Sequence, residues 1–295
     1  MKILVGSGNF SGSNLMVSRW LENMPHHEFK IAAWYRNHRY LNVIDWCLDG
    51  LQGVRVGELN YFDQNFGIQG PYINHDLADA IIDDLLIWKP DLVISDCDLF
   101  TAAIAKVLEV PLWYCSGMLQ MIGIEHDRKE IQTKKLDRIK TYLEMLPEGD
   151  ARLVYSPLCD ISSRPFLKSG FEWVRPYSTT PQDISTENTD LSTIQKAIPD
   201  RCVLNTGETS LASDCVYSGR TTFISPHPHD PEQVLNAQLL EWYGCARNIG
   251  RPQSLGFAKR LIDEYSLTPI LSIQKWKQLD ERVEDFERKL LQPRS

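Results

Sequence analysis

Polar side chains that could bind a phosphorylated ligand gather after a short apolar run, Cys202 to Leu204, which predicts a strand. The apolar spacing of residues 209–218 predicts a helix, and a loop of small and polar residues opens it. The loop consists of Thr206, Gly207, Glu208, Thr209 and Ser210. The N-terminus of a helix attracts phosphate through its unpaired N–H groups and its dipole, and Asp214 in the same helix offers a carboxylate to hydroxyl groups.

A second polar motif follows the next predicted strand, residues 221–225, at the start of a predicted helix, residues 231–243. Asp230, Gln233, Asn236 and Ala237 have the spacing D-x-x-Q-x-x-N-A, and His229 stands directly before them. Carboxylate and amide groups in fixed positions can accept hydrogen bonds from hydroxyl groups, and the amide can also donate to them. The alternative is a structural role, in which Asp230 caps the helix and Asn236 and Ala237 only contribute to its packing.

Together the two motifs resemble the donor-binding half of GT-B glycosyltransferases, in particular the MGT/UGT-like families and the GlcNAc transferase of peptidoglycan synthesis. The resemblance covers about residues 200–250, and it extends to 1–120 through a strand, a glycine loop and the segment KPDLVISD. It implies that the loop amides face a diphosphate and that Asp214 holds ribose hydroxyls. It also implies that Asp230 and Gln233 bind the donor sugar and that His229 touches the donor. The donor substrate would be a nucleotide diphosphate sugar, most simply a UDP-sugar, with no permanently bound cofactor and no metal.

An inverting transfer needs a group that removes the proton of the acceptor hydroxyl. Asp96 and Asp98 directly follow the predicted strand 92–95, at the edge of a parallel sheet where ligands bind, and they are the first candidates. His126, with Glu125 beside it, is the second choice. The families resembled usually carry a histidine near the end of the N-terminal loop, where this chain has Ser13 or Asn14. Both aspartates could instead cap the next helix.

The N-terminal loop follows the predicted strand Lys2 to Val5 and has glycines in the spacing G-x-G-x-x-x-G. In the GT-B interpretation this loop faces the acceptor, through Gly8, Asn9, Phe10, Ser11 and Gly12. The spacing is one residue longer than the dinucleotide fingerprint, and Arg36 at the end of the second strand could bind a 2′-phosphate. An NADP-dependent oxidoreductase is therefore the competing enzyme class.

Alternating strands and helices predict an α/β protein with two Rossmann-like lobes, the second of them shortened. We expect an acceptor-side lobe over residues 1–150, a nucleotide-sugar-binding lobe over 151–255 and C-terminal helices over 256–295. The stretch 148–199 is rich in Pro, Ser, Thr and Asp, and this composition indicates an interdomain region. Residues 272–291 carry apolar side chains at helical spacing, which predicts a long amphipathic helix packing across the lobes.

The lack of a secretory signal and the lack of a long apolar run predict a soluble, cytoplasmic protein. The net charge of −8 gives no overall attraction to the phosphate backbone of nucleic acids. The predicted function is transfer of a sugar to the hydroxyl of a small molecule or glycan. A hydroxymethylated DNA base, as in phage enzymes, is a further acceptor. It would require a local basic channel, for which Arg36, His38, Arg39 and the run 128–140 are candidates. A binding partner that keeps the donor half without catalysis is the non-enzymatic alternative.

Overall fold

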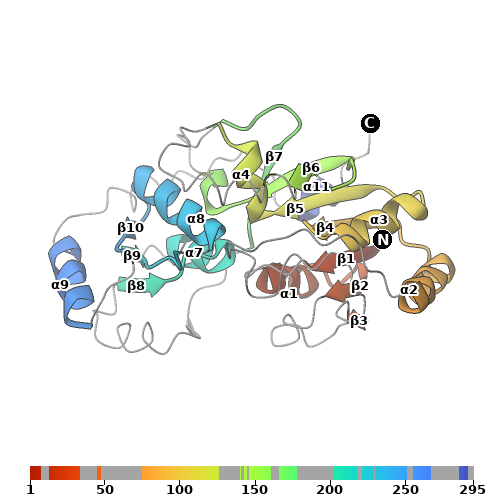
Figure 1. The fold of residues 1–295 in the computed structure, drawn as a ribbon, viewed down its shortest axis with the longest axis horizontal. Helices are drawn as coiled ribbons and strands as arrows, with labels where there is room; N and C mark the ends of the chain where they lie inside the picture. The colour runs from red at the N-terminus through yellow and green to blue at the C-terminus, as the bar shows by residue number, and fades with distance from the viewer. Residues whose placement is uncertain are drawn as a thin grey trace. The chain divides into compact units, whose positions relative to one another are not determined.

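The computed structural model describes residues 1–7, 13–33, 45–47, 75–125, 140, 143–144, 146–160, 166–177, 202–217, 221–228, 230–250, 255–266 and 286–291. The chain divides into two compact units. The first comprises Met1–Gly123, Lys134–Val154 and Lys168–Glu172, and the second comprises Ile124–Thr133, Tyr155–Leu167 and Trp173–Ser295. Each unit contains parallel strands and helices (Figure 1).

A seven-stranded sheet in the order β3-β2-β1-β4-β5-β6-β7 forms the centre of the first part of the fold. Its elements, with the short helices that follow β5 and β6, are β1 (Lys2–Ser7), α1 (Ser13–Asn23), β2 (Glu28–Ala33), β3 (Trp46–Cys47), α2 (His75–Trp88), β4 (Leu92–Asp96), α3 (Leu99–Val107), β5 (Leu112–Ser116), η3 (Gly117–Leu119), α4 (Gln120–Gly123), β6 (Ala151–Tyr155), η5 (Pro157–Asp160) and β7 (Glu172–Val174). From β3 to β6, neighbouring strands run parallel.

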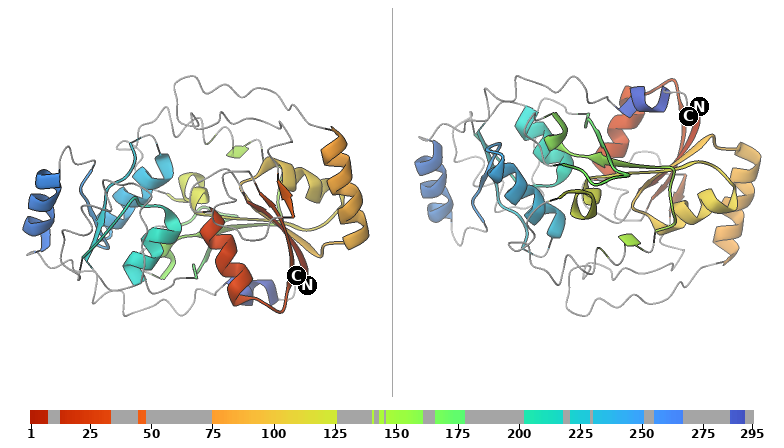
Figure 2. Two further views of the ribbon diagram at one scale, coloured as in Figure 1. Left: turned by 90° about the horizontal axis from the view of Figure 1, so that it is seen from below. Right: turned by 90° about the horizontal axis from the view of Figure 1, so that it is seen from above.

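The direction of the strand order changes between β1 and β4, which is the topological switch point of a Rossmann-type sheet. Right-handed crossovers then place α1 and α3 on opposite faces of the sheet, as Figure 2 shows. With both faces covered, the central strands are continuous apolar runs: Ile3-Leu4-Val5 in β1 and Leu92-Val93-Ile94 in β4 are fully buried. The carboxyl ends of β1 and β4 therefore meet on a rigid support, where Ser7 lies beside Asp96.

Helix α3 approaches β1 closely because Gly6 has no side chain. A Cβ atom at Gly6 would lie 1.9 Å from Thr101 Oγ1. The glycine in the sequence G-S-G thus serves helix packing at this position.

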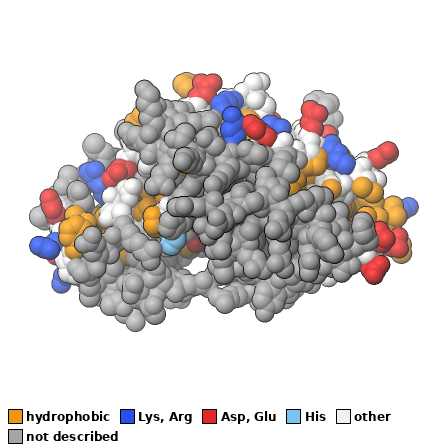
Figure 3. All heavy atoms as spheres, in the orientation of Figure 1, with side chains coloured by type: hydrophobic (Ala, Val, Ile, Leu, Met, Phe, Trp, Pro, Cys, Tyr) orange, Lys and Arg blue, Asp and Glu red, His pale blue; other side chains and the backbone are white. Residues whose placement is uncertain are grey.

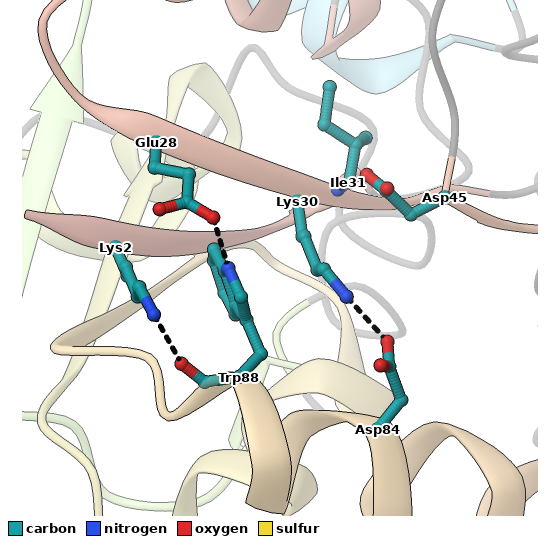
Figure 4. A network of polar contacts seen from close by, with 7 residues as sticks. All are labelled: Lys2, Glu28, Lys30, Ile31, Asp45, Asp84 and Trp88. Atoms are coloured by element: carbon teal, nitrogen blue, oxygen red, sulfur yellow. Dashed lines mark hydrogen bonds and ion pairs between the residues drawn. The ribbon is translucent and has the colours of Figure 1, made fainter.

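A polar network fixes the end of α2 against β1 and β2 (Figure 4). The Lys2 ammonium donates to the Trp88 carbonyl oxygen (3.0 Å), and Trp88 Nε1 donates to Glu28 Oε1 (2.6 Å). Lys30 pairs with Asp84 (2.5 Å), and its Nζ lies 5.4 Å from the centre of the Trp88 ring. These contacts join residues distant in sequence and attach the end of α2 to β1 and β2.

The second unit is built on a three-stranded parallel sheet in the order β10-β9-β8. Its elements are β8 (Cys202–Asn205), α7 (Thr209–Tyr217), β9 (Thr221–Ile224), α8 (Pro231–Trp242), β10 (Arg247–Asn248), α9 (Leu255–Ser266) and α11 (Phe286–Leu291). Cys202, Leu204, Phe223, Ile249 and Ile262 form a buried apolar cluster. Helix α7 packs against α8 and η5, so the turn after β8 is supported on several sides.

The α/β class predicted from the sequence is confirmed, and the predicted strands and helices agree with the described elements to within a few residues. The stretch 148–199, interpreted as an interdomain region, contains strand β6, which pairs in parallel with β5. Its short apolar segment Leu153-Val154-Tyr155 has no periodicity of its own, and pairing with a distant strand decides its structure. The domain boundaries at 150 and 255 stay predictions. So does the long C-terminal helix, of which residues 286–291 are described as helix α11.

No helix in the described parts of the chain is long and apolar enough to cross a membrane. On the face drawn in Figure 3, acidic and basic side chains of described residues lie next to one another.

Candidate functional site

A tight turn follows β8 at the edge of the second sheet. Asn205 Oδ1 accepts a hydrogen bond from the Gly207 N–H (2.7 Å), and the Asn205 carbonyl accepts one from the Ser225 N–H (2.9 Å). Gly207 has φ +90°, and a Cβ there would lie 2.8 Å from Ile224 Cγ2 and 3.0 Å from the Gln233 carbonyl oxygen. Glycine is therefore required both for its backbone conformation and for the close approach of α8.

Side chains from α8 hold the first residue of α7. Glu232 Oε1 accepts hydrogen bonds from the Thr209 N–H (3.2 Å) and the Thr209 hydroxyl (2.7 Å). Asn236 Nδ2 donates to the Gly207 carbonyl (2.8 Å) and to Thr209 Oγ1 (3.0 Å). Asn236, which belongs to the motif that suggested a sugar site, thus has a structural role, since it binds the loop to the next helix.

Asp230 and Gln233 also take part in the local architecture. Asp230 is the N-cap of α8, and its carboxylate accepts from the Gln233 N–H (3.1 Å). The Gln233 side chain accepts from the His227 N–H (2.8 Å) and donates to Glu208 Oε1 at 3.5 Å. The capping role that the sequence offered as the alternative for Asp230 is confirmed, while binding of a sugar by either residue stays a prediction.

Two buried donors of this loop have no hydrogen-bond partner within the described structure: Asn205 Nδ2 and Thr206 Oγ1. Further along the same element, Ser210 and Asp214 are buried side chains of α7. The five predicted loop residues and Asp214 therefore belong to one compact strand-turn-helix unit, with Gln233 beside it. A buried donor without an acceptor is unfavourable by roughly 1–3 kcal/mol, so these two atoms mark a place where an oxygen-rich ligand would be stabilising.

The first sheet places Asp96 and Asp98 at the carboxyl end of β4, both buried. Asp98 is the N-cap of α3, and its Oδ2 accepts from the Thr101 N–H (2.8 Å) and the Thr101 hydroxyl (2.6 Å). Between them Cys97 adopts φ +52°, which turns the chain sharply from strand to helix. The structure thus gives Asp98 a capping role, and catalysis by either aspartate stays a prediction.

Asp96 is buried and acts on the thiol of Cys115 through its charge. Burial raises the pKa of the neighbouring Cys115 thiol well above its usual range, and the charge of Asp96 raises it further. The free thiol of Cys115 is therefore protonated and unreactive in the native protein.

Several predicted site residues lie outside the described residues: His126, His229 and the whole acceptor loop of Gly8, Asn9, Phe10, Ser11 and Gly12. Arg36, His38, Arg39 and residues 128–139 of the candidate basic channel lie outside them as well. Glu125 is described and exposed.

Glu232 and Asn205 are not among the site residues predicted from the sequence. Glu232 is the acidic residue in the first turn of α8, and it is buried although glutamate is rarely so. Its partner Thr209 belongs to another helix, so no local pattern indicates the contact. Asn205 directly precedes the loop, and an Asn before Thr-Gly is a turn signal that could have drawn attention to it.

A scan against protein-family models and a search of curated proteins find no match. Solved structures do match over almost the whole chain. The glycosyltransferase SsfS6 of Streptomyces sp. SF2575 is similar over 99% of this chain and 100% of its own, with 17% identity and a TM-score of 0.56. The glycosyltransferase VinC, solved in complex with dTDP, is similar over 98% of both chains, with 14% identity and a TM-score of 0.54. MurG of Acinetobacter baumannii is similar over 98% of this chain and 97% of its own, with 10% identity and a TM-score of 0.53.

The chain therefore has the GT-B fold of glycosyltransferases, as the motifs in its sequence predicted. SsfS6 has also been solved in complex with thymidine diphosphate.

Proposed function

We propose that this protein is a glycosyltransferase that moves a sugar from a nucleoside diphosphate sugar to an acceptor hydroxyl. The observation that carries the proposal is the loop after β8, where Asn205 Nδ2 and Thr206 Oγ1 are buried donors without a partner among the described residues. The fold supports it, because the similar structures SsfS6 and VinC are glycosyltransferases.

A diphosphate suits this loop for a simple chemical reason. Phosphate oxygens accept hydrogen bonds and carry negative charge, so they satisfy an amide N–H and a hydroxyl without bringing new donors that need partners. Neutral acceptors would satisfy the same atoms with shorter-range and weaker attraction.

For the donor we propose a pyrimidine nucleotide, with a UDP-sugar as the first candidate and a dTDP-sugar as the second. Both SsfS6 and VinC were solved with thymidine diphosphate. In this proposal Asp214 holds the ribose hydroxyls, and Asp230 and Gln233 hold the sugar. His229 contacts the donor, and no metal takes part.

For the acceptor we propose a small molecule or a glycan, with loop 8–12 binding it. Asp96 is the proposed base: it takes the proton of the acceptor hydroxyl while that oxygen bonds to the anomeric carbon and the bond to the diphosphate breaks. Asp98 caps α3 through Thr101, and we place the base at Asp96, the last residue of β4. His126 is the alternative base.

The experiment is a calorimetric titration of the purified protein with UDP, dTDP and their sugar conjugates, followed by assays of sugar release. We expect one pyrimidine nucleotide to bind and its sugar conjugate to be slowly hydrolysed. Binding of NADPH in place of every nucleotide sugar would refute the proposal and favour an oxidoreductase. Binding of the nucleotide sugar without hydrolysis or transfer to any acceptor would favour the non-catalytic partner.

The variant Thr206→Val tests the loop directly. It removes the unpartnered hydroxyl at nearly constant volume, so the free energy of unfolding should stay the same or rise. Nucleotide affinity should fall about tenfold, the effect of one lost hydrogen bond to a charged group. Thr221→Val, at the partly exposed start of β9, is the matched control and should change neither. Unchanged affinity in Thr206→Val would contradict the placement of the diphosphate at this loop.

A further inference from the structure

An apolar patch is exposed on the first unit, at the ends of two neighbouring helices. Leu86 and Ile87 in the last turn of α2 are 54% and 82% exposed, and Val107 at the end of α3 is 63% exposed. Right-handed crossovers place α2 and α3 on the same face of the sheet, and Figures 1 and 2 show them next to each other. Each helix ends at the amino edge of the sheet, because α2 leads into β4, α3 leads into β5, and these two strands are neighbours. The three aliphatic side chains therefore lie at one edge of the first unit.

The charges around the apolar patch differ in sign on its two sides. At about 100° per residue, the exposed residues of α2 lie within about a third of the circumference of the helix. They are Asp76, Asp79, Ala80, Asp83, Leu86 and Ile87. This side of α2 is thus acidic before the patch, whereas the exposed Lys89 follows the patch and the exposed Lys106 stands next to Val107 on α3. Figure 3 shows apolar side chains among acidic and basic ones over these two helices.

We propose that the apolar patch is the interface between two copies of this chain, related by a two-fold axis that crosses α2 between Leu86 and Ile87. Under an axis perpendicular to α2 the two helices run antiparallel, so the segment before the patch meets the segment after it. Asp83 of one copy then faces Lys89 of the second copy, because both residues lie about one turn from the axis. The surface is self-complementary in charge, whereas parallel helices would set Asp83 against Asp83. The proposed donor loop belongs to the second unit, so the two proposals stand or fall separately.

The same charges disfavour a lipid surface as the occupant. The carboxylates of Asp76, Asp79 and Asp83 would approach a membrane together with the apolar patch, and the anionic headgroups there repel them. A second copy of the chain instead brings a lysine to Asp83. Three aliphatic side chains supply less area than the roughly 800 Å² per partner of a standard interface, so the charged rim completes the contact. We therefore expect a weak dimer, with a dissociation constant on the order of 10 μM.

Sedimentation equilibrium of the purified chain, from about 1 to about 200 μM, tests the proposal. We expect a monomer–dimer equilibrium in the unchanged protein. Ile87→Lys should raise the dissociation constant at least about tenfold, because the two-fold axis brings two ammonium groups together in an apolar place. The control Phe166→Lys adds the same charge at a side chain that is also 82% exposed, and it should stay within about twofold. A monomer at every concentration, or an equal effect of the two variants, would overturn the proposal.

Exchange of the two flanking charges tests the antiparallel geometry. Asp83→Lys and Lys89→Asp should each raise the dissociation constant about fivefold, because each variant sets like charges against one another at two symmetric places. The double variant should return to within about twofold of the unchanged protein, since it restores both pairs with their signs exchanged. A double variant as weak as the two single changes combined would refute the pairing of Asp83 with Lys89 and with it the proposed interface.

Two further measurements complete the test. Thermal melting verifies folding, and Leu86→Lys replaces Ile87→Lys should the latter be unfolded, with the same loss of dimer expected. Flotation with vesicles of phosphatidylcholine and phosphatidylserine probes the lipid surface, and we expect no binding that depends on Ile87. Vesicle binding that Ile87→Ser abolishes, in a chain that sediments as a monomer, would overturn the proposal and assign the apolar patch to a membrane.

Discussion

Gly207 is the position where the structure makes the sharpest energetic prediction. Alanine there must keep φ near +90°, a conformation that is unfavourable for a residue with a side chain by about 1–3 kcal/mol. Its Cβ would also lie 2.8 Å from Ile224 Cγ2 and 3.0 Å from the Gln233 carbonyl oxygen. Such overpacking is unfavourable by about 1–3 kcal/mol. Gly207→Ala should therefore lower the free energy of unfolding by about 2–6 kcal/mol in total.

The control is Gly244→Ala in the same unit. Gly244 has φ +71°, but a Cβ there meets nothing within 4 Å, so the variant carries the backbone strain without the overlap. Urea denaturation followed by circular dichroism should show Gly207→Ala less stable than Gly244→Ala by about 1–3 kcal/mol, with equal m-values. Equal stability of the two variants would refute the claim that α8 closes on this turn.

Three further predictions concern the first unit. Gly6→Ala should lower the free energy of unfolding by about 3 kcal/mol in urea titrations, because its Cβ would overlap the Thr101 side chain. A loss below about 1 kcal/mol would show that α3 can shift away from β1 at little energetic cost. Asp98→Ala should lower it by about 1–2 kcal/mol through the lost cap, whereas Asp98→Asn should retain most of the stability, and equal losses in thermal melts would speak against capping. Burial raises the pKa of Tyr114, so its phenol ionises in the unfolded chain before it does so in the native protein. The native state then holds more protons, and stability should fall as the pH rises above about 10. Tyr114→Phe should reduce that slope in urea midpoints measured from about pH 9 to about pH 11, and an identical slope would contradict the assignment.

Much of the fold could be predicted from local patterns. Central strands such as Ile3 to Val5 and Leu92 to Ile94 are buried on both faces, so their continuous apolar runs are readable without a structure. The segment around β6 could not be predicted in this way, because its place in the sheet depends on pairing with β5. From the sequence, Asp98 and Asp230 could be either site residues or helix caps. Their hydrogen bonds show that each is a helix cap.

By itself the sequence determined which loop and which helix start belong to the candidate site, because glycine, small polar residues and the helix periods that follow them are local features. Only the tertiary structure decided what the side chains do there. Thr209 and Glu232 belong to different helices, and strand β9 brings the starts of those helices together. A contact between residues so distant along the chain depends on the packing of whole elements, and no spacing in the sequence encodes that a carboxylate will lie on the end of the other helix.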